Sequence, residues 1–238
     1  MSGNPVKPMM GICGKIPSHG DFLAQDLPID FIDSWNEWLQ AVMAVSREQL
    51  ADAWLPAYLT SPVWHFALSG GVCTESPMVG TLIPSVDLVG RHFPFTLAAA
   101  VDVSPIQAWQ QKQQHAQAEE LILRTLDDDF ELSSWLAELS SLDMAWPTDK
   151  RITTSSVNEP NAKQAWAIEA NIDLNLQGLL HQSYVHQFGR YCLWWTSGSE
   201  RVAPCLLVTS GLPQISQFAG MLAGGWQQWN WLPKTIKF

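Results

Sequence analysis

The chain has 238 residues, of which 47% are hydrophobic and 15% are charged, a balance that is typical of a packed globular protein and excludes a disordered one. Its net charge of −10 disfavours nucleic acids and anionic membranes as partners, because phosphate binding needs clustered cations. The same charge is compatible with a basic protein partner.

The cysteines and the apolar runs indicate a cytoplasmic location. The four cysteines form neither a CxxC motif nor a zinc-site spacing, and reduced thiols are the rule in the cytoplasm. Residues 1–8 are predicted to be flexible, and they lack the apolar core of a signal peptide. No apolar run approaches the ~20 residues that a membrane-spanning helix needs, so we expect no membrane insertion.

The first predicted elements are a strand and a long helix. Residues 9–13 form an apolar run that predicts a strand, and a polar loop at residues 14–22 follows it. Residues 28–50 are expected to form an amphipathic helix. The apolar stripe of this helix recurs with helical spacing and comprises Phe31, Trp35, Trp38, Leu39 and Val42.

Three strands are predicted in the next part of the chain. Residues 62–69 and 78–83 have the composition of strands, and a Gly-Gly pair marks a turn between them. A second polar loop occupies residues 84–94. Residues 95–101 then form an apolar run without alternation, which predicts a central strand buried on both faces.

The second half of the chain is predicted to be helical and then to return to strands. Ser104 and Pro105 begin a capping-box pattern, and the helical region that follows continues with breaks to about residue 142. A polar loop is expected at residues 147–163. The later elements are predicted to be strands at residues 165–170, 191–196 and 204–209 and a helix at residues 212–222.

The alternation of strands and helices predicts an α/β fold, a layered α/β/α sandwich. Several close strand pairs indicate that its central sheet is mixed rather than purely parallel. We expect residues 9–238 to form a single domain, with a main portion at residues 9–146 and a C-terminal portion at residues 164–238 that completes the fold.

The two polar loops carry the candidate functional residues. Their sequences are GKIPSHGDF at residues 14–22 and PSVDLVGRHFP at residues 84–94. Loops held on a rigid scaffold are where function tends to lie, and we expect these two to lie near each other at one end of the sheet. The candidate functional or loop-organising residues are Lys15, His19, Asp21, Ser85, Asp87 and Arg91.

The first loop matches no phosphate-binding motif. A P-loop needs a lysine directly after its second glycine, whereas here Lys15 follows the first glycine and Asp21 follows the second. A metal site is not indicated either, because His19, His65 and His92 show no spacing that is typical of metal ligands. We therefore predict no cofactor-binding and no metal-ligating residues.

A small hydrolase or phosphoryl-handling enzyme is the alternative that the two loops leave open. His19, Asp21 and Ser85 supply the residue types, and side chains from separate segments can converge if the two loops lie side by side. The chain has no G-x-S-x-G nucleophile motif, and we predict no catalytic residues.

The charged residues allow two interpretations each. Asp87 and Arg91 predict a structural ion pair, with Arg91 also able to cap carbonyl groups of the first loop, or else an exposed arginine for an acidic partner. We favour the structural pair. The acidic stretch from Glu119 to Asp143 is either a solvated helix face or a docking patch for a basic partner.

Several blocks of the sequence resemble the TagF (ImpM) family of bacterial type VI secretion systems. GKIPSHGDF is similar to the family's G-K-x-P-x-H-G-D-F signature, and PSVDLVGRHFP is similar to its P-S-V-D-x-V-G-R-x-F-P loop. At Cys192 the family usually has serine or a similar small residue. Shorter similarities to its W-x-x-W-L, S-P-x-W-x-F, W-W and G-L-P patterns lie at residues 35–39, 61–66, 194–195 and 211–213.

The resemblance implies a post-translational repressor of type VI secretion rather than an enzyme. A member of the family is expected to bind Fha, the cytoplasmic scaffold protein that carries a forkhead-associated domain, and to keep it from promoting assembly of the secretion apparatus. A structural part of the secretion machine is a further possibility. The resemblance implies no catalytic residues, in agreement with the analysis of the loops.

Overall fold

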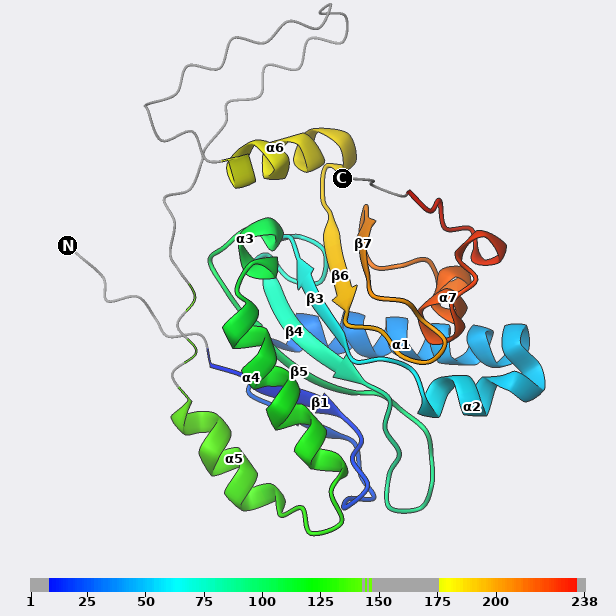
Figure 1. Ribbon diagram of the computed structural model, residues 1–238. Coiled ribbons are helices and arrows are strands. Elements are labelled where there is room, and N and C mark those ends of the chain that lie inside the picture. Colours follow the sequence, from blue (N-terminus) through cyan, green and yellow to red (C-terminus); the bar gives the residue numbers. More distant parts are fainter. Residues whose placement is uncertain (1–8, 143, 145, 147–175, 235–238) are drawn as a thin grey trace, which may run out of the picture.

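The computed structural model describes residues 9–142, 144, 146 and 176–234. They form three layers, with a sheet between two sets of helices (Figure 1). The predicted α/β/α sandwich is therefore confirmed. The expectations for residues 1–8, for the loop at residues 147–163 and for a strand at residues 165–170 lie outside the described residues.

The central sheet has seven strands in the order β2-β1-β5-β4-β3-β6-β7, and every described pairing is antiparallel. The prediction of a mixed sheet is wrong. Most neighbours are consecutive in the chain, and their connections lack the crossover helix that parallel neighbours need. The strands are β1 (Gly11–Gly14), β2 (Leu23–Gln25), β3 (Trp64–Leu68), β4 (Met78–Ile83), β5 (Phe95–Ala100), β6 (Cys192–Thr196) and β7 (Cys205–Thr209).

Strand β5 is central and is covered on both faces, as its continuous apolar sequence predicts. It pairs with β1 on one side and with β4 on the other. Ala98 belongs to the hydrophobic core on one face of the sheet, whereas Leu97 and Ala99 belong to the core on the opposite face. A strand between two cores needs no polar face, which explains the absence of alternation.

One face of the sheet is covered by α1 (Ile29–Leu50), α2 (Trp54–Leu59) and α7 (Phe218–Ala223). The predicted helix at residues 28–50 is confirmed, and all five residues of its apolar stripe are buried. Trp35 lies at the centre of an aromatic cluster, with its ring centroid 4.5 Å from that of Phe66 and 5.7 Å from that of Trp194. Its indole N–H donates to Thr96 Oγ1 over 3.0 Å, so the buried polar atom is satisfied.

The opposite face carries α3 (Pro105–Trp109), α4 (Lys112–Leu123), α5 (Leu132–Ser141) and α6 (Leu176–Phe188). The predicted capping box is confirmed, because Ser104 and Gln107 bond to each other's backbone N–H groups. In Figure 1, α4 and α5 lie in front of the sheet and α1 lies behind it. Short 3₁₀ turns lie at Ala51–Ala53, Arg124–Leu126, Ile215–Gln217 and Trp226–Trp229.

Ala51, directly after α1, has the backbone angles φ 45° and ψ −122°, a conformation that favours glycine. We expect Ala51→Gly to raise the free energy of unfolding by about 1 kcal/mol, because it removes the clash of the alanine Cβ. Ala53→Gly is the matched control, since Ala53 has φ −80° and the same change there lowers stability by roughly 0.5–1 kcal/mol. Urea titrations of both variants test this, and destabilisation by Ala51→Gly would contradict it.

Candidate functional site

The two polar loops lie at the same end of the sheet. The first loop joins β1 to β2, and the second joins β4 to β5. Because β1 and β4 both pair antiparallel with β5, they run in the same direction and end at the same edge. The loops also contact each other directly, since the backbone N–H of Leu88 donates to the carbonyl of His19 over 3.0 Å.

Gly14 is what lets the two loops approach so closely. Its φ is +126°, and a Cβ at this position would lie 2.2 Å from the carbonyl oxygen of Pro94, which is closer than any real contact. The first loop therefore needs glycine at its first position for both conformation and space.

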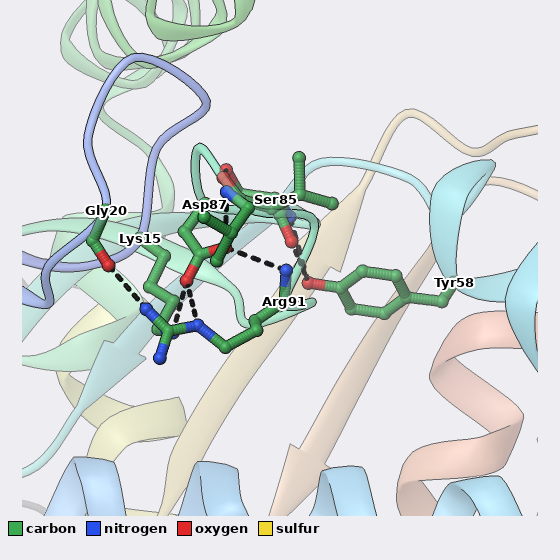
Figure 2. A network of polar contacts seen from close by, with 8 residues as sticks. Lys15, Gly20, Tyr58, Ser85, Asp87 and Arg91 are labelled. Carbon is green, nitrogen blue, oxygen red and sulfur yellow. Dashed lines mark hydrogen bonds and ion pairs between the residues drawn. The ribbon is translucent and has the colours of Figure 1, made fainter.

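Asp87 is the centre of the polar contacts between the loops (Figure 2). Its side chain has no exposed surface. Its Oδ2 accepts from Lys15 Nζ over 2.7 Å and from Arg91 Nε over 2.5 Å. Its Oδ1 accepts from the backbone N–H groups of Val89, over 3.1 Å, and Arg91, over 2.8 Å. Lys15 comes from the first loop, so the carboxylate joins segments that are 72 positions apart in the sequence.

The charge on Asp87 is fixed by these contacts. Burial alone would raise the pKa of its carboxyl, but the hydrogen bonds from Lys15 and Arg91 outweigh burial and hold the pKa far below its usual range. A buried carboxylate that stays ionised needs such partners. Asp87 is therefore an anion at neutral pH, and the loops are folded around it.

Arg91 and Tyr58 attach the second loop to its surroundings. Arg91 Nη2 donates to the carbonyl of Gly20 over 2.6 Å, so this side chain is both the partner of Asp87 and a cap of the first loop. The hydroxyl of Tyr58, on α2, donates to the carbonyl of Ser85 over 2.7 Å and accepts from its N–H over 2.9 Å. Figure 2 shows Tyr58 reaching the loop from the opposite side to Lys15 and Gly20. Nothing in the local sequence around Tyr58 predicts its contact with the second loop.

The other candidate residues do not form a catalytic group. The half-buried His19 contacts Ser18 Oγ through Nδ1 over 2.9 Å, whereas Asp21 is exposed. Ser85 is buried, and both of its backbone groups bond to Tyr58. Among the described residues, no hydrogen bond joins the side chains of His19, Asp21 and Ser85, so the geometry does not assemble a nucleophile with its base.

A buried polar cluster that sequence reasoning missed lies between α4 and the sheet. His65 on β3 contacts Thr81 Oγ1 through Nδ1 and Glu119 Oε2 through Nε2, both over 2.9 Å. The neighbouring His115 donates from Nε2 to the carbonyl of Ala108 over 2.7 Å. These residues come from four separate elements, β3, β4, α3 and α4, and nothing in their local spacing predicts that they meet.

The pKa values of Glu119 and His115 in this cluster are both lowered, but by different causes. The hydrogen bond from His65 lowers the pKa of Glu119 although partial burial opposes it. Burial lowers the pKa of His115 to about 4, with the bond to Ala108 opposing and the nearby His65 adding to the shift. His115 is therefore neutral at physiological pH.

Within the described residues, no group of three histidine, cysteine, aspartate or glutamate side chains is arranged to hold a metal ion. The helices of the same part of the chain are each too short or too polar to cross a membrane.

Comparison with known proteins shows similarity to a protein family and to solved structures. The model of the family "TagF N-terminal domain, Type VI secretion system-associated" matches residues 11–142, which include both polar loops. PA0076 from Pseudomonas aeruginosa PAO1, known from a crystal structure at 2.05 Å resolution, is 28% identical with a TM-score of 0.76. The alignment covers 96% of this chain and 97% of PA0076. The search among curated proteins found no match.

Proposed function

Because the chain belongs to the TagF family of type VI secretion system-associated proteins, we propose that it is a cytoplasmic binding protein that represses this secretion system after translation. Its partner in this proposal is Fha, the scaffold with a forkhead-associated domain. Holding Fha would keep it from promoting assembly of the apparatus.

The observation that carries the proposal is that the charged side chains of the two polar loops bond within the loops. Lys15, Asp87 and Arg91 bond to one another and to the loop backbone, so they fix a shape. A loop pair whose charged groups are used in this way is suited to presenting a rigid surface, and rigid surfaces lose little entropy on binding. The enzyme alternative lacks comparable support, since its three side chains are not bonded to one another.

A pull-down of purified protein with the Fha of the same secretion cluster tests the proposal. We expect the parent protein to retain Fha at micromolar concentrations and Arg91→Ala to retain less, because Arg91 holds both loops in place. Arg201→Ala is the matched control, as it removes another exposed arginine outside the two loops.

Two results would contradict the proposal. Absence of Fha binding by the parent protein would show that Fha is not the partner of this protein. Recovery of the protein with assembled secretion particles, in place of free Fha, would instead indicate a structural part of the machine.

A further inference from the structure

The tip of the second loop presents two apolar side chains to solvent. Leu88 is 67% exposed and Val89 is 70% exposed. Exposed apolar residues are common singly, but these two are adjacent in the chain, and the two loops also carry Phe22 and Phe93, whose rings are 5.7 Å apart. We call residues 87–91 the anchor segment.

The anchor segment is held rigidly, because each of its five backbone N–H groups has an acceptor within the protein. Asp87 N–H donates to the carbonyl of Arg91, and Leu88 N–H donates to the carbonyl of His19. Val89 and Arg91 both donate to Asp87 Oδ1, and Gly90 donates to the carbonyl of Asp87. A surface loop with every donor satisfied has few alternative conformations of similar energy.

Stability alone does not account for this arrangement. It requires a fully buried carboxylate, and buried ion pairs are often no more stabilising than apolar residues of similar volume. What the buried Asp87 does is fix the backbone that carries two exposed apolar side chains. A fixed backbone has a use when these side chains are to enter a partner, since the backbone entropy of ordering the loop has already been lost.

Arg91, next to the exposed Leu88 and Val89, indicates which charge a partner would present around these two side chains. Arg91 uses Nε and Nη2 within the loops, yet its side chain is 62% exposed. The outer edge of its guanidinium can therefore donate hydrogen bonds to a carboxylate of a partner, but it would repel a basic rim. Such a partner surface is a protein rather than a membrane, because a chain with net charge −10 is repelled by anionic lipid headgroups.

We propose that Leu88 and Val89 form a preorganised apolar anchor that enters an apolar pocket of a protein partner, with a carboxylate of the partner's pocket rim meeting the outer edge of Arg91. The inference rests on the proposed function only in taking Fha as the first probe.

The test compares two double variants by titration calorimetry against purified Fha. Leu88→Ser with Val89→Ser is expected to weaken binding by at least about 30-fold, as for a binding hot spot, while the thermal midpoint stays near that of the parent. Leu123→Ser with Leu126→Ser is the matched control, since these leucines are 38% and 40% exposed and lie at the end of α4 and in the following turn, outside the two loops. Loss of affinity in the control but not in the anchor variant would overturn the inference.

The carboxylate is tested by the salt dependence of binding. Arg91→Gln removes the charge and keeps a polar side chain, so we expect its binding to depend less steeply on salt than that of the parent. Equal salt slopes for the two proteins would overturn this half of the inference.

A second experiment distinguishes a protein that does not bind Fha from one whose Leu88 and Val89 play no part in binding. If the parent protein does not bind Fha, the anchor is tested in cells that carry the secretion system, by overproducing each protein and measuring secreted substrate. Lower secretion with the parent and unchanged secretion with the anchor variant would support the anchor for another partner. Equal secretion with both proteins would overturn it.

Discussion

Asp87→Ala is expected to lower the midpoint of thermal unfolding by about 5–10 °C, the shift that loss of a buried carboxylate and its charged hydrogen bonds causes in a chain of this size. The variant removes the acceptor of both Lys15 Nζ and Arg91 Nε and leaves the backbone N–H groups of Val89 and Arg91 without their partner. We expect the variant to lose Fha binding as well, since the anchor segment is no longer held. Differential scanning calorimetry measures the first effect.

Asp21→Ala is the control for Asp87→Ala, because Asp21 is an exposed aspartate of the first loop. Its midpoint should stay within about 2 °C of the parent, as for most surface substitutions. Similar midpoints for both variants would show that the network around Asp87 does not hold the loops.

The pH dependence of this effect follows from the lowered pKa of Asp87. A carboxyl whose pKa is lower in the folded than in the unfolded protein contributes stability that is complete above the unfolded value of ~3.9 and fades as the pH falls below it. The difference in midpoint between parent and Asp87→Ala should therefore be constant from neutral pH to mild acid and shrink only in stronger acid.

Acidification from pH 7 to pH 4 is expected to remove about 3 kcal/mol of stability through His115, whose pKa is about 4 when folded against ~6.5 when unfolded. A histidine whose pKa is lowered by folding stabilises the protein fully above the unfolded value. The contribution is then lost as the pH falls from that value through the folded pKa, because protons bind the unfolded chain more readily.

His115→Gln tests this assignment. Glutamine can still donate to the carbonyl of Ala108 but does not titrate, so the variant should lose less stability between pH 7 and pH 4 than the parent does. The slope of the free energy of unfolding against pH should decrease but not reach zero, because burial also lowers the pKa of His92 and of His181. Urea titrations across this pH range measure it, and an unchanged slope would exclude His115 as the main titrating group.

An element of the fold could be predicted from the sequence where neighbouring residues show why it is buried or capped. This holds for the apolar stripe of α1, for the continuous apolar run of β5 and for the serine cap of α3. The direction of neighbouring strands has no such local expression, so the sheet was expected to be mixed. The helix α6 was not predicted because it has no fully buried residue and so no one-sided apolar stripe.

The candidate site shows the same division. The residues of both loops could be selected from their sequence, and Asp87 with Arg91 could be paired because they are four positions apart. The contributions of Tyr58 and of the His65–Glu119 contact come from elements that only the fold brings together. Sequence spacing thus indicates which side chains belong to a loop, but not which distant side chain holds that loop in place.

The bond between Lys15 and Asp87 also makes the order of folding relevant to function. Lys15 reaches the carboxylate only when β1 has docked against β5, so the second loop acquires its final shape together with the sheet and not as a separate hairpin. A newly made chain that has formed the β4–β5 hairpin alone would have Arg91 beside Asp87 but would still lack the second cation, Lys15. The surface that we assign to partner binding is therefore present only in chains whose first strand is in place, and misfolded copies of the protein would not occupy the partner.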